Sequence, residues 1–199
     1  MISLDAGFWV LVVIFGLVGM MRGWTKEVVA TAGLVLSLFA QFWFGHVLVG
    51  VFGGGEASGV LNSAAAIKSQ FLVRSLAHVT FAFFAYQGPA LARQFSGGRF
   101  GDRARNRIQE SSLGLIVGLI NGYLIVGTVW GFLEYQIVDR SALALAPGIA
   151  YPFPAEVLTR PLVGTPAFEL ISKLPLPLLQ DWLPLLVVVL FLFVIVAMI

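Results

Sequence analysis

Two ionisable residues lie inside an apolar stretch of the sequence, where they could do chemistry. Arg74 and His78 are four residues apart, so on a helix they face the same way. A neutral imidazole at that depth could bind a proton, a quinone or the metal centre of a chlorophyll-type pigment. In the structural alternative, His78 bonds to a neighbouring helix and Arg74 extends to the outer membrane surface. We favour the structural alternative.

The sequence carries none of the common motifs of catalytic or metal sites. It has no cysteine, which excludes disulfides, a thiol nucleophile and cysteine-based zinc or iron–sulfur sites. It also lacks His-Glu-x-x-His, Gly-x-Ser-x-Gly and a P-loop. We therefore expect no enzymatic activity, no metal and no cofactor. A pigment or quinone is expected only if the chain is part of a larger complex.

A charged hairpin, Arg22-Gly-Trp-Thr-Lys26-Glu27, follows the first apolar stretch. In one interpretation it is a turn whose Trp24 and basic residues anchor at the lipid headgroups. In the other, Glu27 forms an ion pair with Arg22 that sets the angle between two helices. Lys26 is also within reach of Glu27.

A second basic group lies in the segment 93–107. We interpret it as a contact with anionic lipid and not with RNA, because the net charge of +2 gives no bulk attraction to nucleic acid. Its members are Arg93, Arg99, Arg103, Arg105 and Arg107.

Glycines recur at helical spacing and predict close helix packing. A spacing of four places small residues on one stripe, where the backbone of another helix can approach. The later stripe contains Gly114, Gly118 and Gly122, and Gly127 and Gly131 form a further pair. The first apolar stretch adds Gly16, Gly19 and Gly23. The sequence leaves open whether the partner helix belongs to this chain or to another protein.

The composition shows which elements must position these residues. Hydrophobic residues make up 59% of the chain and charged residues 11%, and the mean hydropathy is +0.94. A soluble fold could not hide so much apolar surface, so lipid must be the main solvent. We predict an all-α integral membrane protein of about five transmembrane helices. They are expected at 8–21 (extendable to residue 4), 28–51, 67–92, 113–133 and 183–199.

The distribution of basic residues predicts the orientation. Seven of the 12 basic residues flank the turns near residues 24 and 102, which places that side in the cytoplasm. The N-terminus is then outside and the C-terminus inside. Asp5 precedes the first apolar run, which is the reverse of a signal peptide.

The chain divides into a four-helix membrane region at 1–135, a connection at 136–182 and a terminal helix at 183–199. Seven of the nine prolines fall in the connection and forbid one long helix there. A short helix is expected after Thr165, with Pro166 in its first turn. We expect this amphipathic segment to lie on the outer membrane surface, through Leu162, Leu170, Leu176 and Leu178.

The pattern resembles the colicin V production (CvpA) family of bacterial inner-membrane proteins. The resemblance rests on Asp5, Gly16, Gly19, Arg22-Gly23 and Glu27 and on the stripe Gly114, Gly118, Gly122, and covers residues 4–50 and 110–133. Glu110-Ser111 and Asn121-Gly122 stand where that family typically has Asp-Arg and Arg-Gly. The final helix goes beyond a four-helix plan.

The resemblance implies a multi-pass inner-membrane protein associated with colicin V production or export and with envelope integrity, without catalytic activity. We expect a structural or assembly role, with membrane lipids and other integral membrane subunits as partners and no nucleic acid. One alternative is an accessory subunit of a respiratory or photosynthetic complex, which the uncharged helix at 183–199 would suit. Another is a small transporter or channel that uses Arg74 and His78.

Overall fold

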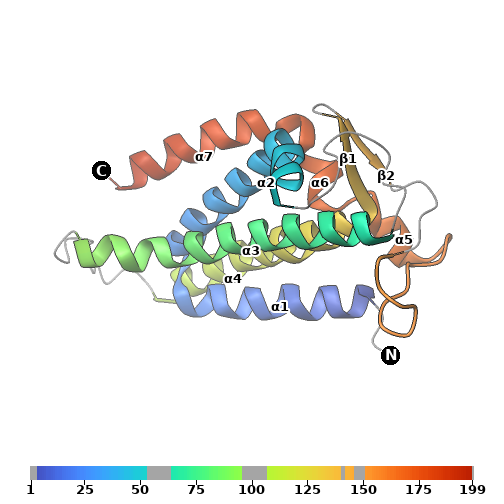
Figure 1. The fold of residues 1–199 in the computed structure, drawn as a ribbon. Helices are drawn as coiled ribbons and strands as arrows, with labels where there is room; N and C mark the ends of the chain where they lie inside the picture. The colour runs from blue at the N-terminus through green and yellow to red at the C-terminus, as the bar shows by residue number, and fades with distance from the viewer. Residues whose placement is uncertain (1–3, 53–63, 96–106, 140–141, 146–150, 199) are drawn as a thin grey trace.

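The computed structural model describes residues 4–52, 64–95, 107–139, 142–145 and 151–198. Within these ranges it is a bundle of long helices that lie alongside one another (Figure 1). The long helices are α1 (Leu4–Arg22), α2 (Trp24–Phe52), α3 (Ala64–Phe95), α4 (Arg107–Glu134) and α7 (Leu183–Met198). The predicted all-α membrane fold is confirmed.

Four helical segments of the described chain are long and apolar enough to cross a membrane. They are Leu4–Arg22, Trp24–Leu48, Gln109–Glu134 and Pro175–Phe193. The remaining predicted segment, α3, has 32 residues and is long enough, but it falls short of this apolarity. Lys68, Arg74 and His78 are among the polar residues that lower its hydropathy.

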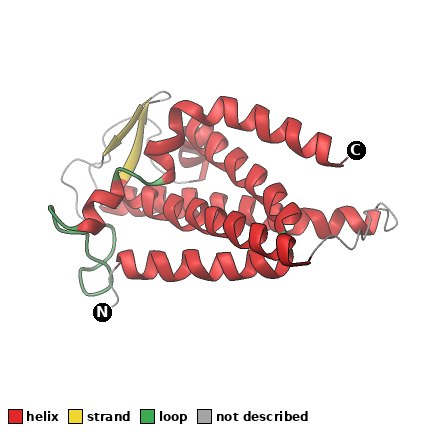
Figure 2. Cartoon of the chain, turned by 180° about the vertical axis from the view of Figure 1, so that it is seen from behind, coloured by secondary structure: helices red, strands yellow, loops and turns green. Residues whose placement is uncertain are grey.

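The helices pack in a defined order. α1 lies along α4, α2 packs against both α3 and α4, and α7 packs against α2 (Figures 1 and 2). The core between α2, α3 and α4 contains Leu34, Leu38 and Leu124. α7 is the least covered helix, and most of its apolar side chains face outward. In a membrane, lipid or another hydrophobic protein must cover that surface.

The segment after α4 contains structure that the sequence analysis did not predict. β1 (Tyr135–Asp139) and β2 (Ala142–Leu145) form an antiparallel hairpin in which Tyr135 lies opposite Leu145. A helical turn α5 (Pro166–Ile171) follows, then α6 (Pro175–Leu179) and a 3-10 turn, η1 (Gln180–Trp182). The helix start at Thr165 is confirmed, because its hydroxyl accepts the Phe168 N–H at 3.3 Å.

The connection does not lie wholly on the surface. Leu162 and Leu178 are exposed, as expected, but Leu176 is buried, so its predicted place on the membrane surface is wrong. The reason lies on α4. A Cβ added to Gly127 would lie 2.7 Å from the Pro175 side chain, and one added to Gly131 would lie 2.8 Å from that of Leu176. Because these glycines have no side chain, α6 can pack directly on the end of α4.

Candidate functional site

The glycine stripe of α4 packs against α1 of the same chain. A Cβ added to Gly19 would lie 2.7 Å from the Cα of Gly118, and one added to Gly118 would lie 2.6 Å from the carbonyl oxygen of Phe15. Gly114 meets Gly19, and Gly122 meets Phe15. The two backbones are therefore in contact over about two turns, and the stripe is not available to another protein.

Gly16 of α1 and Gly23, which follows α1, have different neighbours. Gly16 faces the side chain of Leu119, whose Cδ2 would lie 2.7 Å from an added Cβ. Gly23 has φ +86° and separates α1 from α2, and a Cβ there would meet nothing within 4 Å. Its left-handed backbone, which few other residues adopt, is what requires glycine at this turn.

Beside the α1–α4 glycine contact, a fully buried carboxylate joins four helices. Glu27 of α2 accepts the Arg22 Nη1–H through Oε1 at 2.7 Å. Its Oε2 accepts from Asn121 Nδ2 of α4 at 2.8 Å and from the Tyr86 hydroxyl of α3 at 3.0 Å. Both carboxylate oxygens are thus occupied, which is the condition for burying a charge at tolerable cost.

The same groups are bonded to one another, and we call Arg22, Glu27, Thr31, Tyr86 and Asn121 the Glu27 network. Thr31 Oγ1 lies 2.7 Å from Asn121 Oδ1 and 2.9 Å from the Glu27 carbonyl oxygen. Arg22 Nη2 donates to the Tyr86 carbonyl at 2.8 Å, and its guanidinium lies 4.3 Å from the centre of the Tyr86 ring. Of the two interpretations of the hairpin, the structure contains the ion pair. Lys26 is half-buried in the first turn of α2.

Arg74 and His78 lie in the interior and contact other helices. The expectation that Arg74 extends to the membrane surface is wrong, because its side chain is fully buried. Arg74 Nη1 donates to the Tyr135 carbonyl at 2.9 Å, and its guanidinium lies 4.1 Å from the centre of the Phe132 ring. The start of β1 thus offers an acceptor inside the bundle. His78 Nδ1 lies 2.8 Å from Ser37 Oγ of α2, the interhelix contact of the structural alternative.

The five arginines expected at anionic lipid stay a prediction. Arg99, Arg103 and Arg105 lie outside the described residues, and of Arg93 and Arg107 the helical backbone alone is described.

A second buried carboxylate, Glu134, lies at the end of α4. Glu134 accepts the Tyr151 hydroxyl through Oε1, and its Oε2 is 2.9 Å from Arg160 Nε. The Arg160 N–H is not aimed at that oxygen, so this contact is an ion pair without a hydrogen bond. Burial, together with the adjacent Glu134 carboxylate, raises the pKa of the Tyr151 phenol. No local pattern in the sequence indicates these partners.

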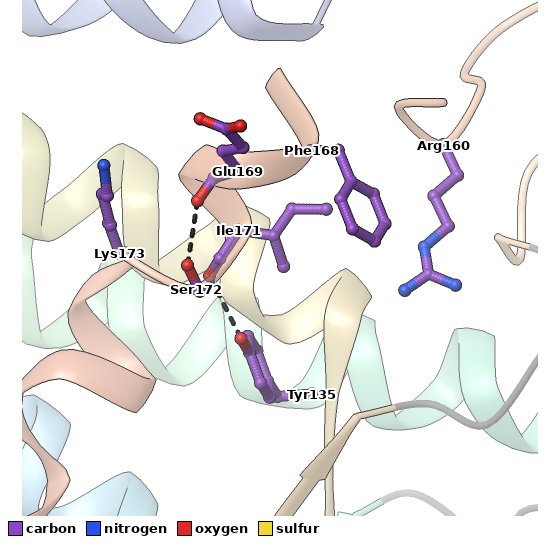
Figure 3. A pocket seen from close by; sticks show the side chains of 7 residues that line it. All are labelled: Tyr135, Arg160, Phe168, Glu169, Ile171, Ser172 and Lys173. Atoms are coloured by element: carbon purple, nitrogen blue, oxygen red, sulfur yellow. Dashed lines mark hydrogen bonds between the residues drawn. The ribbon is translucent and has the colours of Figure 1, made fainter. Parts of the chain in front are cut away.

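A cavity of about 410 Å³ opens beside α5, next to this ion pair (Figure 3). Its wall is formed by the side chains of Tyr135, Phe168 and Ile171, and Ser172 also lines it. Three charged residues border it, namely Arg160, Glu169 and Lys173. In Figure 3 Phe168 lies between Ile171 and Arg160, and the charged ends of Glu169 and Lys173 point the same way.

Among the described residues, no group of three histidine, aspartate or glutamate side chains could hold a metal ion. A comparison with protein families matches residues 4–146 to the family described as Colicin V production protein. The matched range contains the α1–α4 glycine contact and the Glu27 network, whereas the cavity residues from Arg160 onward and α7 follow it. The comparisons with curated proteins and with solved structures gave no match.

Proposed function

Because the chain belongs to the colicin V production protein family, we propose that it is a non-enzymatic structural or assembly protein of the bacterial inner membrane. Its four apolar helical segments suit a multi-pass membrane protein. In this role it would support the production or export of a peptide toxin, and the integrity of the envelope, by holding membrane helices in a fixed arrangement.

The hydrogen bonding of the Glu27 carboxylate is the observation that carries this proposal. A general acid or base needs a free oxygen that can reach a substrate. Both oxygens of Glu27 are instead bonded to Arg22, Tyr86 and Asn121, which come from three other helices. This buried carboxylate of the family-matched region is therefore used to join helices.

The proposed orientation has the N-terminus outside and the C-terminus in the cytoplasm. In Figure 1 the start of α1 and the end of α7 lie at opposite ends of the bundle, as this orientation requires. The chain has no cysteine, so single cysteines can test it directly. A cysteine at Thr159 should react with an impermeant maleimide in intact spheroplasts, and one at Thr25 should react after lysis only. The reverse pattern would invert the topology.

The structural role is tested by a substitution that disturbs helix packing, compared with one at an unpacked position. In the bacterium that makes the protein, Gly118→Leu should reduce colicin V export and detergent tolerance, because Gly118 contacts the α1 backbone. Gly88→Leu in α3 is the matched control, since a Cβ there meets nothing within 4 Å. Normal export with Gly118→Leu at normal protein abundance would contradict the proposal.

A second candidate is an accessory subunit of a larger membrane complex, which the exposed face of α7 favours. Phe191, Leu192 and Val196 are among its outward apolar side chains. Native mass analysis of the protein from its own membrane, in mild detergent, distinguishes the candidates. A constant stoichiometry with other subunits would support the accessory role, and a free monomer or homo-oligomer would support the independent protein.

A further inference from the structure

We propose that the cavity beside α5 binds the headgroup of a zwitterionic phospholipid, with the phosphate at Lys173 and the amine at Glu169. The proposal rests on the depth of the cavity in the membrane, on the apolar loop next to it, and on the signs of the charges that border it.

The cavity lies at the level of the membrane interface. One apolar span ends at Glu134, and the cavity residue Tyr135 follows it directly. The next span begins at Pro175, two residues after the cavity residue Lys173. Because both span ends mark the edge of the hydrocarbon region, the cavity between them lies at headgroup depth.

The loop that precedes α5 also indicates a lipid surface. Val157, Leu162 and Val163 are 72%, 76% and 83% exposed, although all three are apolar. Leu162 and Val163 are followed by the turn at Gly164, where φ is +86°. Burying such side chains in the acyl boundary gains roughly 25 cal/mol per Å² of apolar surface, so this loop is stabilised when it dips into lipid.

The lining of the cavity matches a molecule with an apolar body and a charged end. Tyr135, Phe168 and Ile171 suit the glycerol backbone and the first carbons of the acyl chains. A phosphate prefers a guanidinium or an ammonium group. Arg160 approaches Glu134 through Nε and its side chain is 31% exposed, so its terminal nitrogens can reach a ligand. Lys173 is exposed and lies on the other side of Phe168 and Ile171 from Arg160 (Figure 3), next to Glu169.

The balance of charge favours a zwitterion over a simple anion. Arg160 is paired with the buried Glu134, and Lys173 lies on the same short segment as Glu169, four residues away. The local net charge of these four groups is zero, so a single anion gains little from the site. A headgroup with a phosphate and a primary amine can satisfy Lys173 and Glu169 together.

The experiment compares lipids on the purified full chain in detergent. Phosphatidylethanolamine should raise the unfolding midpoint by about 5 °C when it is well above its dissociation constant, and more than phosphatidylglycerol does. Lys173→Gln and Glu169→Gln should each remove most of this shift. Both residues are exposed, so their midpoints without lipid should equal that of the wild type. Lys68→Gln, an exposed lysine on α3, is the control and should keep the shift.

Three outcomes would overturn the proposal. An equal shift with inorganic phosphate alone would assign the site to the free ion. A larger shift with phosphatidylglycerol that survives Glu169→Gln would make it a simple anion site. An unchanged phosphatidylethanolamine shift in both the Lys173 and the Glu169 variant would place the lipid elsewhere.

Discussion

Asn121 Nδ2 donates to two oxygens of Glu27, the carboxylate Oε2 at 2.8 Å and the main-chain carbonyl at 3.0 Å. This amide stands where the resemblance to the family leads us to expect an arginine. The positive charge that balances Glu27 therefore comes from Arg22 on α1, and α4 supplies a neutral donor. Asn121 thus lies at the centre of the buried network.

Asn121→Leu should lower the free energy of unfolding by about 2–4 kcal/mol, because it removes a donor from a buried carboxylate. In a chain of this size the midpoint should fall by roughly 5–15 °C, measured by thermal unfolding in detergent. Thr128→Val, on the same helix, is the control. Thr128 is fully buried and its hydroxyl has no partner in the described structure, so this change should be neutral or stabilising. Equal losses in the two variants would contradict the role of the network.

Gly118→Ala should destabilise the chain by about 1–3 kcal/mol, because the added methyl group overpacks the α1–α4 contact. Its Cβ would lie 2.6 Å from the Phe15 carbonyl oxygen and 2.9 Å from the Gly19 Cα, and backbone atoms cannot move aside cheaply. Gly88→Ala meets no packed neighbour, and its gain in helix propensity is offset by the following Pro89, so it should change stability by less than about 1 kcal/mol. Urea unfolding of both variants checks the difference in size. A stable Gly118→Ala chain would refute the close contact.

The contact between α2 and α3 predicts a rescue. A Cβ on Gly33 would lie 2.5 Å from the Cβ of Ala85, so Gly33→Ala alone should be destabilising. Adding Ala85→Gly removes the obstructing methyl group. In a double-mutant cycle the coupling between the two changes should be favourable by about 1–2 kcal/mol. Additive effects would show that the two helices do not meet at these residues.

Ionisation of the Tyr151 phenol should lower the stability of the folded chain in alkali. Its pKa is raised in the folded chain, because burial disfavours the phenolate and the hydroxyl is bonded to Glu134. The stabilisation is complete below the unfolded value of about 10 and is lost as the pH rises above it toward the folded value. Unfolding midpoints between pH 7 and 11 should fall less steeply above pH 10 in Tyr151→Phe. An unchanged slope would contradict the buried hydrogen bond.

The contacts that depend on local sequence could be predicted. Thr165 precedes Pro166 at a helix start, and its cap needs residues of one turn only. Arg22 and Glu27 are five residues apart across a glycine turn, so their pairing was one of two open interpretations. Asn121 and Tyr86 are 94 and 59 residues from Glu27, and only the packing of α3 and α4 on α2 brings them together.

The structure after α4 was harder to predict, because burial there depends on neighbours and not on pattern. Leu176 has the same hydropathy as Leu178, yet the first packs on Gly131 and the second is exposed. The hairpin of Tyr135–Asp139 and Ala142–Leu145 is short. The alternation of apolar and polar residues along its strands is a weak signal compared with the long apolar runs of the helices. Arg74 is hydrogen-bonded inside the bundle to the Tyr135 carbonyl, which lies 61 residues away and is brought there by the packing of the end of α4.

The α1–α4 glycine contact imposes an order on biosynthesis. A ribosome adds about 5–20 residues per second, so Gly114 emerges roughly 5–20 seconds after Gly19. α1 has few contacts with α2, and during that interval its glycine face has no native partner. Asn121 emerges equally late after Glu27. A chain released before α4 inserts therefore has an uncovered glycine face on α1 and a buried carboxylate that lacks its Asn121 donor. These are two features by which quality-control proteases can distinguish it from a finished molecule.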